Sequence, residues 1–117
     1  MAQEGIDPGA LLARTYPIPG GYRVRLRLLR RSDLPALRAL LPDELELQRL
    51  VRFDPRQRVA IAAASPRARG EALLGAGAID LVAGAEPDPL VLDATSDPAV
   101  AELLDTALRA RARRRAA

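Results

Sequence analysis

The chain has 117 residues, a mass of 12.6 kDa, a formal net charge of +3 and 49% hydrophobic residues. This length makes a single domain with room for one hydrophobic core. Because the sequence contains neither cysteine nor histidine, it excludes disulfides, zinc-thiolate sites and thiol nucleophiles, and it lacks the commonest general base and metal ligand.

Residues 1–21 contain several prolines and glycines without a sustained hydrophobic period. We interpret them as a flexible leader, partly ordered at most, and residues 22–117 as the domain. The first residues have no basic and apolar regions of a signal peptide, and no run of about 18 apolar residues occurs. The sequence therefore predicts a cytoplasmic protein with no membrane segment.

A strand is predicted from Tyr22 to Leu28, where apolar residues alternate with arginines. This alternation suits an outer strand. A helix follows over residues 34–41, with Ser32 or Asp33 as its cap and Pro42 as its stop. A second short helix is expected to begin near Asp43.

Three further strands are expected in a meander. The segment from Arg58 to Ala64 is apolar on both faces, as a central strand is. After a hairpin connection at residues 68–71, a long strand runs from Leu73 to Val82, and its two glycines mark a bulge or a close backbone approach. A short strand is predicted from Leu90 to Leu92.

The last predicted element is a helix that begins at Pro98, with Ser96 or Asp97 as its cap. Apolar residues recur at helical spacing from Val100 to Leu108. Arginines crowd the end of this helix, which is the charge order that the helix dipole favours.

All 18 basic residues are arginines, and two groups of them stand out, at residues 23–31 and 109–115. We interpret these groups as a solvated strand face and as a helix C-terminus. Aromatic residues make up only 3% of the chain, so no stacking platform for bases is available. A nucleic-acid partner is therefore not expected.

The predicted order is strand, helix, helix, strand, strand, strand, helix. This order, with VRLRLLRRSDLPALRALL at residues 24–41, RLVRFDPRQRVAIAA at residues 49–63 and LLGAGAIDL at residues 73–81, resembles the GNAT superfamily of acyl-coenzyme A dependent N-acetyltransferases. The resemblance covers residues 22–111. It implies an α+β fold in which helices pack on an open, mainly antiparallel sheet that is truncated at its C-terminus.

The resemblance also implies where acetyl-coenzyme A would bind. Backbone groups of Leu90, Val91 and Leu92 would contact the pantetheine arm. The following turn, at residues 93–99, would hold the pyrophosphate with groups of Thr95, Ser96 and Ala99. This turn departs from the family pattern because it has no glycine and carries two aspartates, and a like charge repels a phosphate. The sequence thus predicts a degenerate coenzyme site.

A match to the family's phosphate loop, R-x-x-G-x-A, occurs elsewhere in the chain, from Arg67 to Ala72. As a phosphate loop it would open a helix at Leu73. Two internal glycines disfavour that helix, at about 1 kcal/mol each. The hairpin is the preferred interpretation.

The candidates for chemistry are two carboxylates. Asp80 interrupts an apolar strand and Asp93 closes the next strand, so both are predicted to project into one cleft and to act as a general base toward an amine. The alternative is structural: Asp80 ends an apolar strand face and Asp93 caps the following turn. No metal-ligand spacing stands out.

Three hypotheses on function stay open. The first is a minimal N-acetyltransferase that uses acetyl-coenzyme A, with a second subunit completing the cofactor cleft. The second is a non-catalytic binding or regulatory module, or a homodimerising domain, that kept the fold and uses an unpaired strand edge for docking. The third is a nucleic-acid accessory protein, which would lose affinity steeply with salt.

Overall fold

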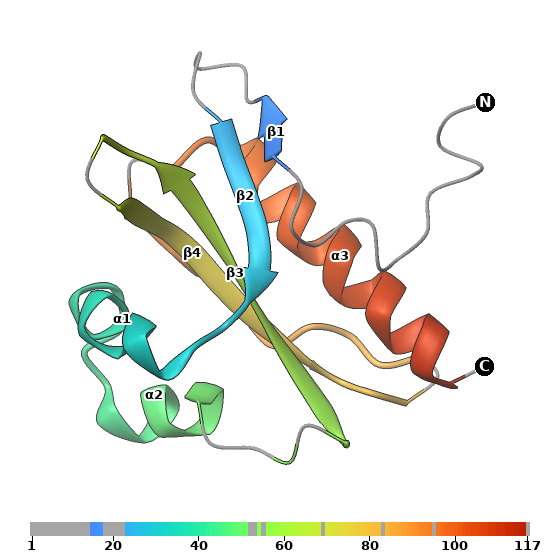
Figure 1. Cartoon of the computed structure of the whole chain (residues 1–117). Helices are drawn as coiled ribbons and strands as arrows, with labels where there is room; N and C mark the ends of the chain where they lie inside the picture. Colours follow the sequence, from blue (N-terminus) through green and yellow to red (C-terminus); the bar gives the residue numbers. More distant parts are fainter. Residues whose placement is uncertain are drawn as a thin grey trace.

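The structure is a computed structural model that describes residues 15–17, 23–51, 54, 56–68, 70–82, 84–94 and 96–116 (Figure 1). The described part of the chain is an α+β fold. Its elements, in chain order, are β1 (Thr15–Pro17), β2 (Arg23–Leu28), a 3-10 turn (Arg31–Asp33), α1 (Leu34–Leu40), α2 (Glu44–Val51), β3 (Arg58–Pro66), β4 (Glu71–Asp80), β5 (Val91–Leu92) and α3 (Pro98–Ala116).

The five strands form one sheet in the order β1-β2-β3-β4-β5, and every neighbouring pair is antiparallel. The sheet is built on the β3-β4 hairpin, in which nine residue pairs face one another from Arg58 opposite Asp80 to Pro66 opposite Glu71. The predicted meander of three strands is therefore confirmed. A strand neighbours the next in sequence throughout the sheet, so no crossover connection is needed.

The edge of the sheet differs from the prediction at β2. This strand was expected to be the outer one, but Tyr16 of β1 pairs with Val24, and β1 forms the edge. The alternation in β2 arises because Val24 and Leu26 are fully buried on the α3 side while Arg25 is exposed. Part of the predicted leader thus belongs to the sheet.

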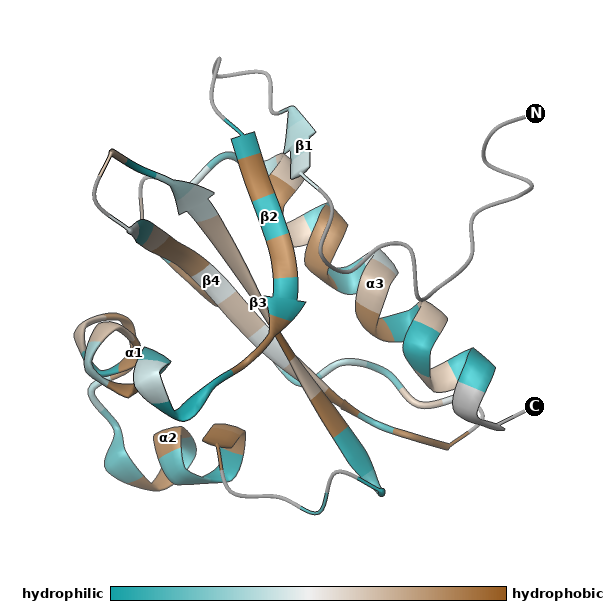
Figure 2. Cartoon of the chain, in the orientation of Figure 1, coloured by the Kyte–Doolittle hydropathy of each residue, from teal (hydrophilic) through white to brown (hydrophobic). Residues whose placement is uncertain are grey.

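The helices cover both faces of the sheet: α3 lies on one face, and α1 and α2 lie on the other (Figure 1). Figure 2 shows the apolar stripe of α3 turned to the sheet. The core on the α3 face includes Leu26, Ile61, Ile79, Leu104 and Leu108. The opposite face is made largely of alanines from β3 and β4, packed against three leucines, Leu37, Leu47 and Leu50.

Two glycines of β4 allow the segment before and within β5 to approach. A Cβ atom on Gly75 would lie 2.6 Å from Leu92 Cδ2 and 2.7 Å from the Val91 carbonyl oxygen. A Cβ on Gly77 would collide with the side chain of Leu90. The register also shifts opposite Gly75, between Ala63 and Ala64. The expectation of a bulge and a close backbone approach is therefore confirmed.

The R-x-x-G-x-A segment forms the turn of the β3-β4 hairpin and opens no helix. The Arg67 N–H donates to the Gly70 carbonyl at 2.9 Å, and Gly70 has a φ of 78°, which only glycine adopts without strain. Because β4 begins directly afterwards at Glu71, the phosphate-loop interpretation is wrong.

Candidate functional site

The two predicted acidic residues lie far apart: Asp80 ends β4, whereas Asp93 follows β5 and lies beside Leu74 of β4. Asp80 faces Arg58 at the C-terminal end of the strand, and its carboxylate pairs with that guanidinium at 3.0 Å. The Asp93 N–H donates to the Leu74 carbonyl at 2.8 Å. Leu74 is six residues before Asp80, which is about 20 Å along a strand. The prediction that both carboxylates share one cleft is therefore wrong.

The predicted pyrophosphate turn is closed by its own side chains at the start of α3. The Asp97 carboxylate accepts the Ala99 N–H at 2.8 Å, so Asp97 is the cap of α3. Pro98 contributes no N–H. Ser96 is turned toward the sheet, because its hydroxyl donates to the Leu74 carbonyl at 3.0 Å. Thr95 lies outside the described residues.

The residues predicted to contact the pantetheine arm lie at the sheet edge. Val91 and Leu92 form β5 and pair with Ala76 and Gly75. Leu90 precedes the strand and packs against the core of the α3 face. Within the described ranges, no strand pairs with the outer side of β5. In the part of the chain that the structure describes, this edge is therefore unpaired.

One cavity lies beside this edge, between α2 and β5 on the face that α1 and α2 cover. It has a volume of about 210 Å³. Its apolar wall contains Leu41, Leu50, Pro89 and Val91. Its polar wall contains Glu46, Arg49, Arg58 and Asp88. We refer to these eight residues as the α2-β5 pocket.

One arginine fixes the side of the α2-β5 pocket that the sheet forms. Arg58 begins β3, and its guanidinium pairs with Asp80 of β4 and with Asp88 of the segment before β5. The Asp88 N–H in turn donates to the Ala78 carbonyl at 3.0 Å. The segment before β5 is thus fastened to β4 through its backbone and to β3 through the Asp88 side chain. Arg58 Nε is buried and has no hydrogen-bond partner in the described part of the chain.

Two charged side chains on α2, in contrast to Arg58, have no ion-pair partner among the described residues. Glu46 and Arg49 are exposed at the rim of the pocket, and neither side chain has a polar partner among the described residues. Asp43 fixes the start of their helix by accepting the Leu45 and Glu46 N–H groups at 3.0 and 3.2 Å. The pocket therefore presents one unpaired carboxylate and one unpaired guanidinium.

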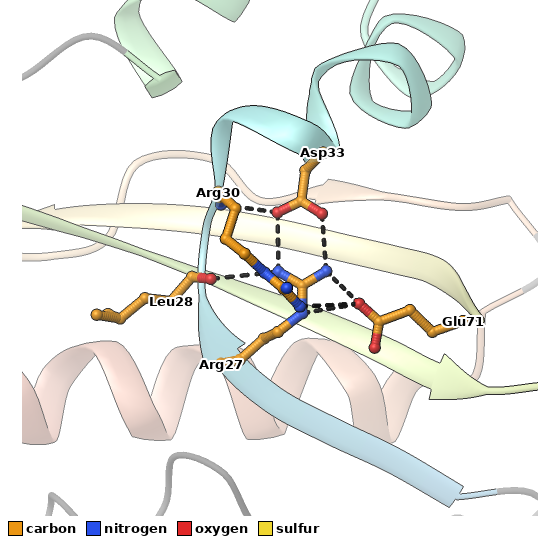
Figure 3. A network of polar contacts seen from close by, with 5 residues as sticks. All are labelled: Arg27, Leu28, Arg30, Asp33 and Glu71. Carbon is orange, nitrogen blue, oxygen red and sulfur yellow. Dashed lines mark hydrogen bonds and ion pairs between the residues drawn. The ribbon is translucent and has the colours of Figure 1, made fainter.

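A second polar cluster has the opposite character (Figure 3). Arg27 donates to both oxygens of Asp33, at 2.8 and 2.7 Å, and its Nε donates to Glu71 at 2.8 Å. The side chains of Arg27 and Asp33 are only 12% and 8% exposed. Arg27 was expected on a solvated strand face, so this prediction is wrong for Arg27.

The same cluster explains the start of α1. Asp33 was a predicted helix cap, but it makes no side-chain cap, because its carboxylate instead accepts from Arg27 and from the Arg30 N–H at 2.8 Å. Burial favours the neutral carboxyl, but the hydrogen bonds from Arg27 and Arg30 outweigh it and lower the pKa of Asp33. The bonds to Asp33 also raise the pKa of Arg27. Every charge is satisfied internally, so we assign this cluster to stability.

Sequence reasoning named Val91 as a site residue but missed the charged residues of the α2-β5 pocket. Glu46 and Arg49 have the spacing of neighbours on one helix face, and Arg58 is a charge at the start of an apolar strand. These local signals exist, but nothing in them indicates that the segment before β5 lies against α2.

Comparisons with family models, with curated proteins and with solved structures find no match. In the described part of the chain, no helix is both long and apolar enough to cross a membrane. The same residues contain no group of three acidic side chains arranged to hold a metal ion.

Proposed function

We propose that this chain is a non-catalytic binding domain, with an element order like that of the GNAT N-acetyltransferases, whose ligand site is the α2-β5 pocket. The observation that carries the proposal is the cap of α3. The Asp97 carboxylate holds the Ala99 N–H at the turn where the resemblance implies the pyrophosphate of acetyl-coenzyme A. A phosphate at this point would have to displace one carboxylate and approach a second, at Asp93.

Electrostatics supports the same conclusion. A helix N-terminus attracts an anion because its N–H groups are unpaired and its dipole end is positive. At α3 the anion is already supplied by Asp97 itself. Two like charges 4 Å apart repel by about 4 kcal/mol near a protein surface, which exceeds the typical dipole contribution of about 0.3–1 kcal/mol.

Calorimetric titration with acetyl-coenzyme A tests this proposal. We expect no binding by the native chain at millimolar coenzyme. The Asp97→Asn variant keeps a cap but removes its charge, and Asp43→Asn is the matched control because Asp43 caps α2 in the same way. Micromolar binding by the native chain would overturn the proposal. Binding gained only by Asp97→Asn would support both the non-catalytic assignment and the acetyl-coenzyme A ancestry.

An acetyl-coenzyme A dependent N-acetyltransferase is the second candidate function. The observation that favours it is the position of the α2-β5 pocket beside the open edge of β5, where the resemblance implies the pantetheine arm. An amine in the pocket would then be the acyl acceptor. Release of coenzyme A thiol during incubation with an amine panel would identify this activity.

The open edge of β5 also supports a homodimer as a proposed partner state. Leu92 is 36% exposed there, and an unpaired strand edge can be extended by a second chain. Sedimentation analysis over a tenfold concentration range measures this association. A monomer at all concentrations would contradict it.

A further inference from the structure

We infer that the α2-β5 pocket binds a small zwitterion, a molecule with an aliphatic body that carries one carboxylate and one ammonium group. The inference rests on the proposed function only in taking this pocket as the ligand site. It deepens that function by naming the chemical class of the ligand.

The two unpaired charges of α2 carry the inference. Glu46 and Arg49 are three residues apart, so their side chains lie on the same helix face, with Cβ atoms about 5–6 Å apart. This spacing would allow them to pair with each other. They do not, and both line the pocket. In a ligand with both charges, the carboxylate would bind to Arg49 and the ammonium group would bind to Glu46.

The remaining polar residues of the pocket, Arg58 and Asp88, favour the same class of ligand. Arg58 is already paired with two carboxylates, so it presents no excess positive charge to a multiply charged anion such as a phosphate. Its Nε–H still lacks an acceptor. The pocket lining carries two arginines and two acidic residues, so its formal charge is zero and suits a ligand without net charge.

The volume of the pocket and its apolar wall narrow the choice of ligand. A volume of about 210 Å³ corresponds to about seven water molecules at their liquid volume. This space fits a compact metabolite. Leu41, Leu50 and Val91 offer aliphatic contact. We therefore choose L-leucine as the probe.

The test is calorimetric titration of the full chain with three related probes. Isopentylamine is leucine without the carboxylate, and 4-methylpentanoate is leucine without the ammonium group. Because Glu46 and Arg49 are exposed, water weakens each charge contact, and we expect each single-charge probe to bind about two- to fivefold more weakly than leucine. Equal binding of all three probes, or no leucine binding at millimolar concentration, would overturn the inference.

Two variants test which side chain binds which charged group of leucine. Arg49→Gln should weaken leucine binding about two- to fivefold and leave isopentylamine binding unchanged. Glu46→Gln should weaken leucine similarly and leave 4-methylpentanoate unchanged. The matched controls are Arg113→Gln and Glu102→Gln, at exposed positions on α3, and both should bind leucine like the native chain. Glu46 and Arg49 are exposed, so the variants should fold, which thermal unfolding verifies. Equal losses in the control variants would contradict a specific site.

The same sample titrated with acetyl-coenzyme A separates this inference from the proposed function. Binding of leucine together with acetyl-coenzyme A would overturn the non-catalytic function and keep the ligand class, with leucine as a model acceptor. Binding of acetyl-coenzyme A without leucine would overturn both. If neither binds, the ligand class fails and the non-catalytic assignment stands.

Discussion

The two faces of the sheet are built differently. The α3 face is filled by large aliphatic side chains from three strands and from a helix of 19 residues. The α1-α2 face is lined by alanines and covered by two helices of seven and eight residues. Helices this short are marginal without tertiary contacts, so their position depends on what they rest against.

Charged anchors replace large apolar side chains on the α1-α2 face. Arg27 ties the start of α1 to the sheet near one end, and Arg58 fastens the segment before β5 at the other end. The α2-β5 pocket lies at the second of these anchors, because Arg58 is one of its lining residues. The comparison teaches that the α3 face is held together mainly by apolar packing, whereas the α1-α2 face is held partly by ion pairs and retains a cavity.

The α3 face should show the largest effect of a single truncation. Leu108 is fully buried in that core, so Leu108→Ala should lower the free energy of unfolding by about 3 kcal/mol. Urea unfolding followed by circular dichroism measures this loss. Leu45→Ala is the control, because Leu45 on α2 is 79% exposed and should change stability by less than about 0.5 kcal/mol. Similar losses from the two variants would contradict the comparison.

The anchor of α1 should be nearly as sensitive. Arg27→Met leaves the carboxylate of Asp33 buried without its main partner, which should lower the free energy of unfolding by about 3 kcal/mol. Arg38→Met is the matched control, because it removes an ion pair with Glu44 whose side chains are 53% and 55% exposed. That loss should stay below about 1 kcal/mol. The assignment of Arg27 to stability fails if both substitutions have the same effect in urea.

A methyl group between β4 and β5 should have an intermediate effect. Gly75→Ala places a Cβ against the Val91 carbonyl oxygen, and such overpacking destabilises by about 1–3 kcal/mol. We expect the Asp93 N–H, which bonds to Leu74 across this contact, to exchange faster with deuterium. Gly84→Ala has open space but a left-handed φ of 78°, so it should lose about 1 kcal/mol. In Gly84→Ala, the Asp93 N–H should exchange with deuterium at the same rate as in the native chain.

The smallest effect concerns pH. The pKa of Asp33 is lowered in the folded chain, so the stability that its charge contributes is fully present above its ordinary pKa of about 3.9. It is lost as the pH falls further, through the folded-state value. Urea midpoints between pH 6 and pH 2.5 should therefore fall less steeply for Asp33→Asn than for the native chain. Parallel curves would show that the charge of Asp33 is not coupled to folding.

Local pattern was sufficient for most of the elements. Period-two alternation located β2, and the apolar run bounded by Asp54 and Pro66 located β3. A cap, a proline at the first helical position and a helical apolar stripe located the start of α3. These signals act over a few residues, so they are readable without the fold. The three residues of β1 are too few to show a period, and they were assigned to a leader.

The candidate site was harder to predict. Asp80 and Asp93 each come at the end of an apolar strand. Neighbouring antiparallel strands run in opposite directions, so their C-terminal ends point away from each other. The topology itself therefore separates the two acids. The α2-β5 pocket joins residues 41–50 with Arg58 and residues 88–91. No local period connects these three segments.

The sequence by itself determined the antiparallel α+β architecture, the glycines that admit β5 and the self-capped start of α3, because each depends on backbone conformation and on contacts within a few residues. Only the tertiary structure decided which charges are satisfied and which remain free. Arg27 and Arg49 look alike in the sequence, yet one is buried between two carboxylates and the other faces a pocket. The physical reason is that the environment of a charge is set by segments distant along the chain.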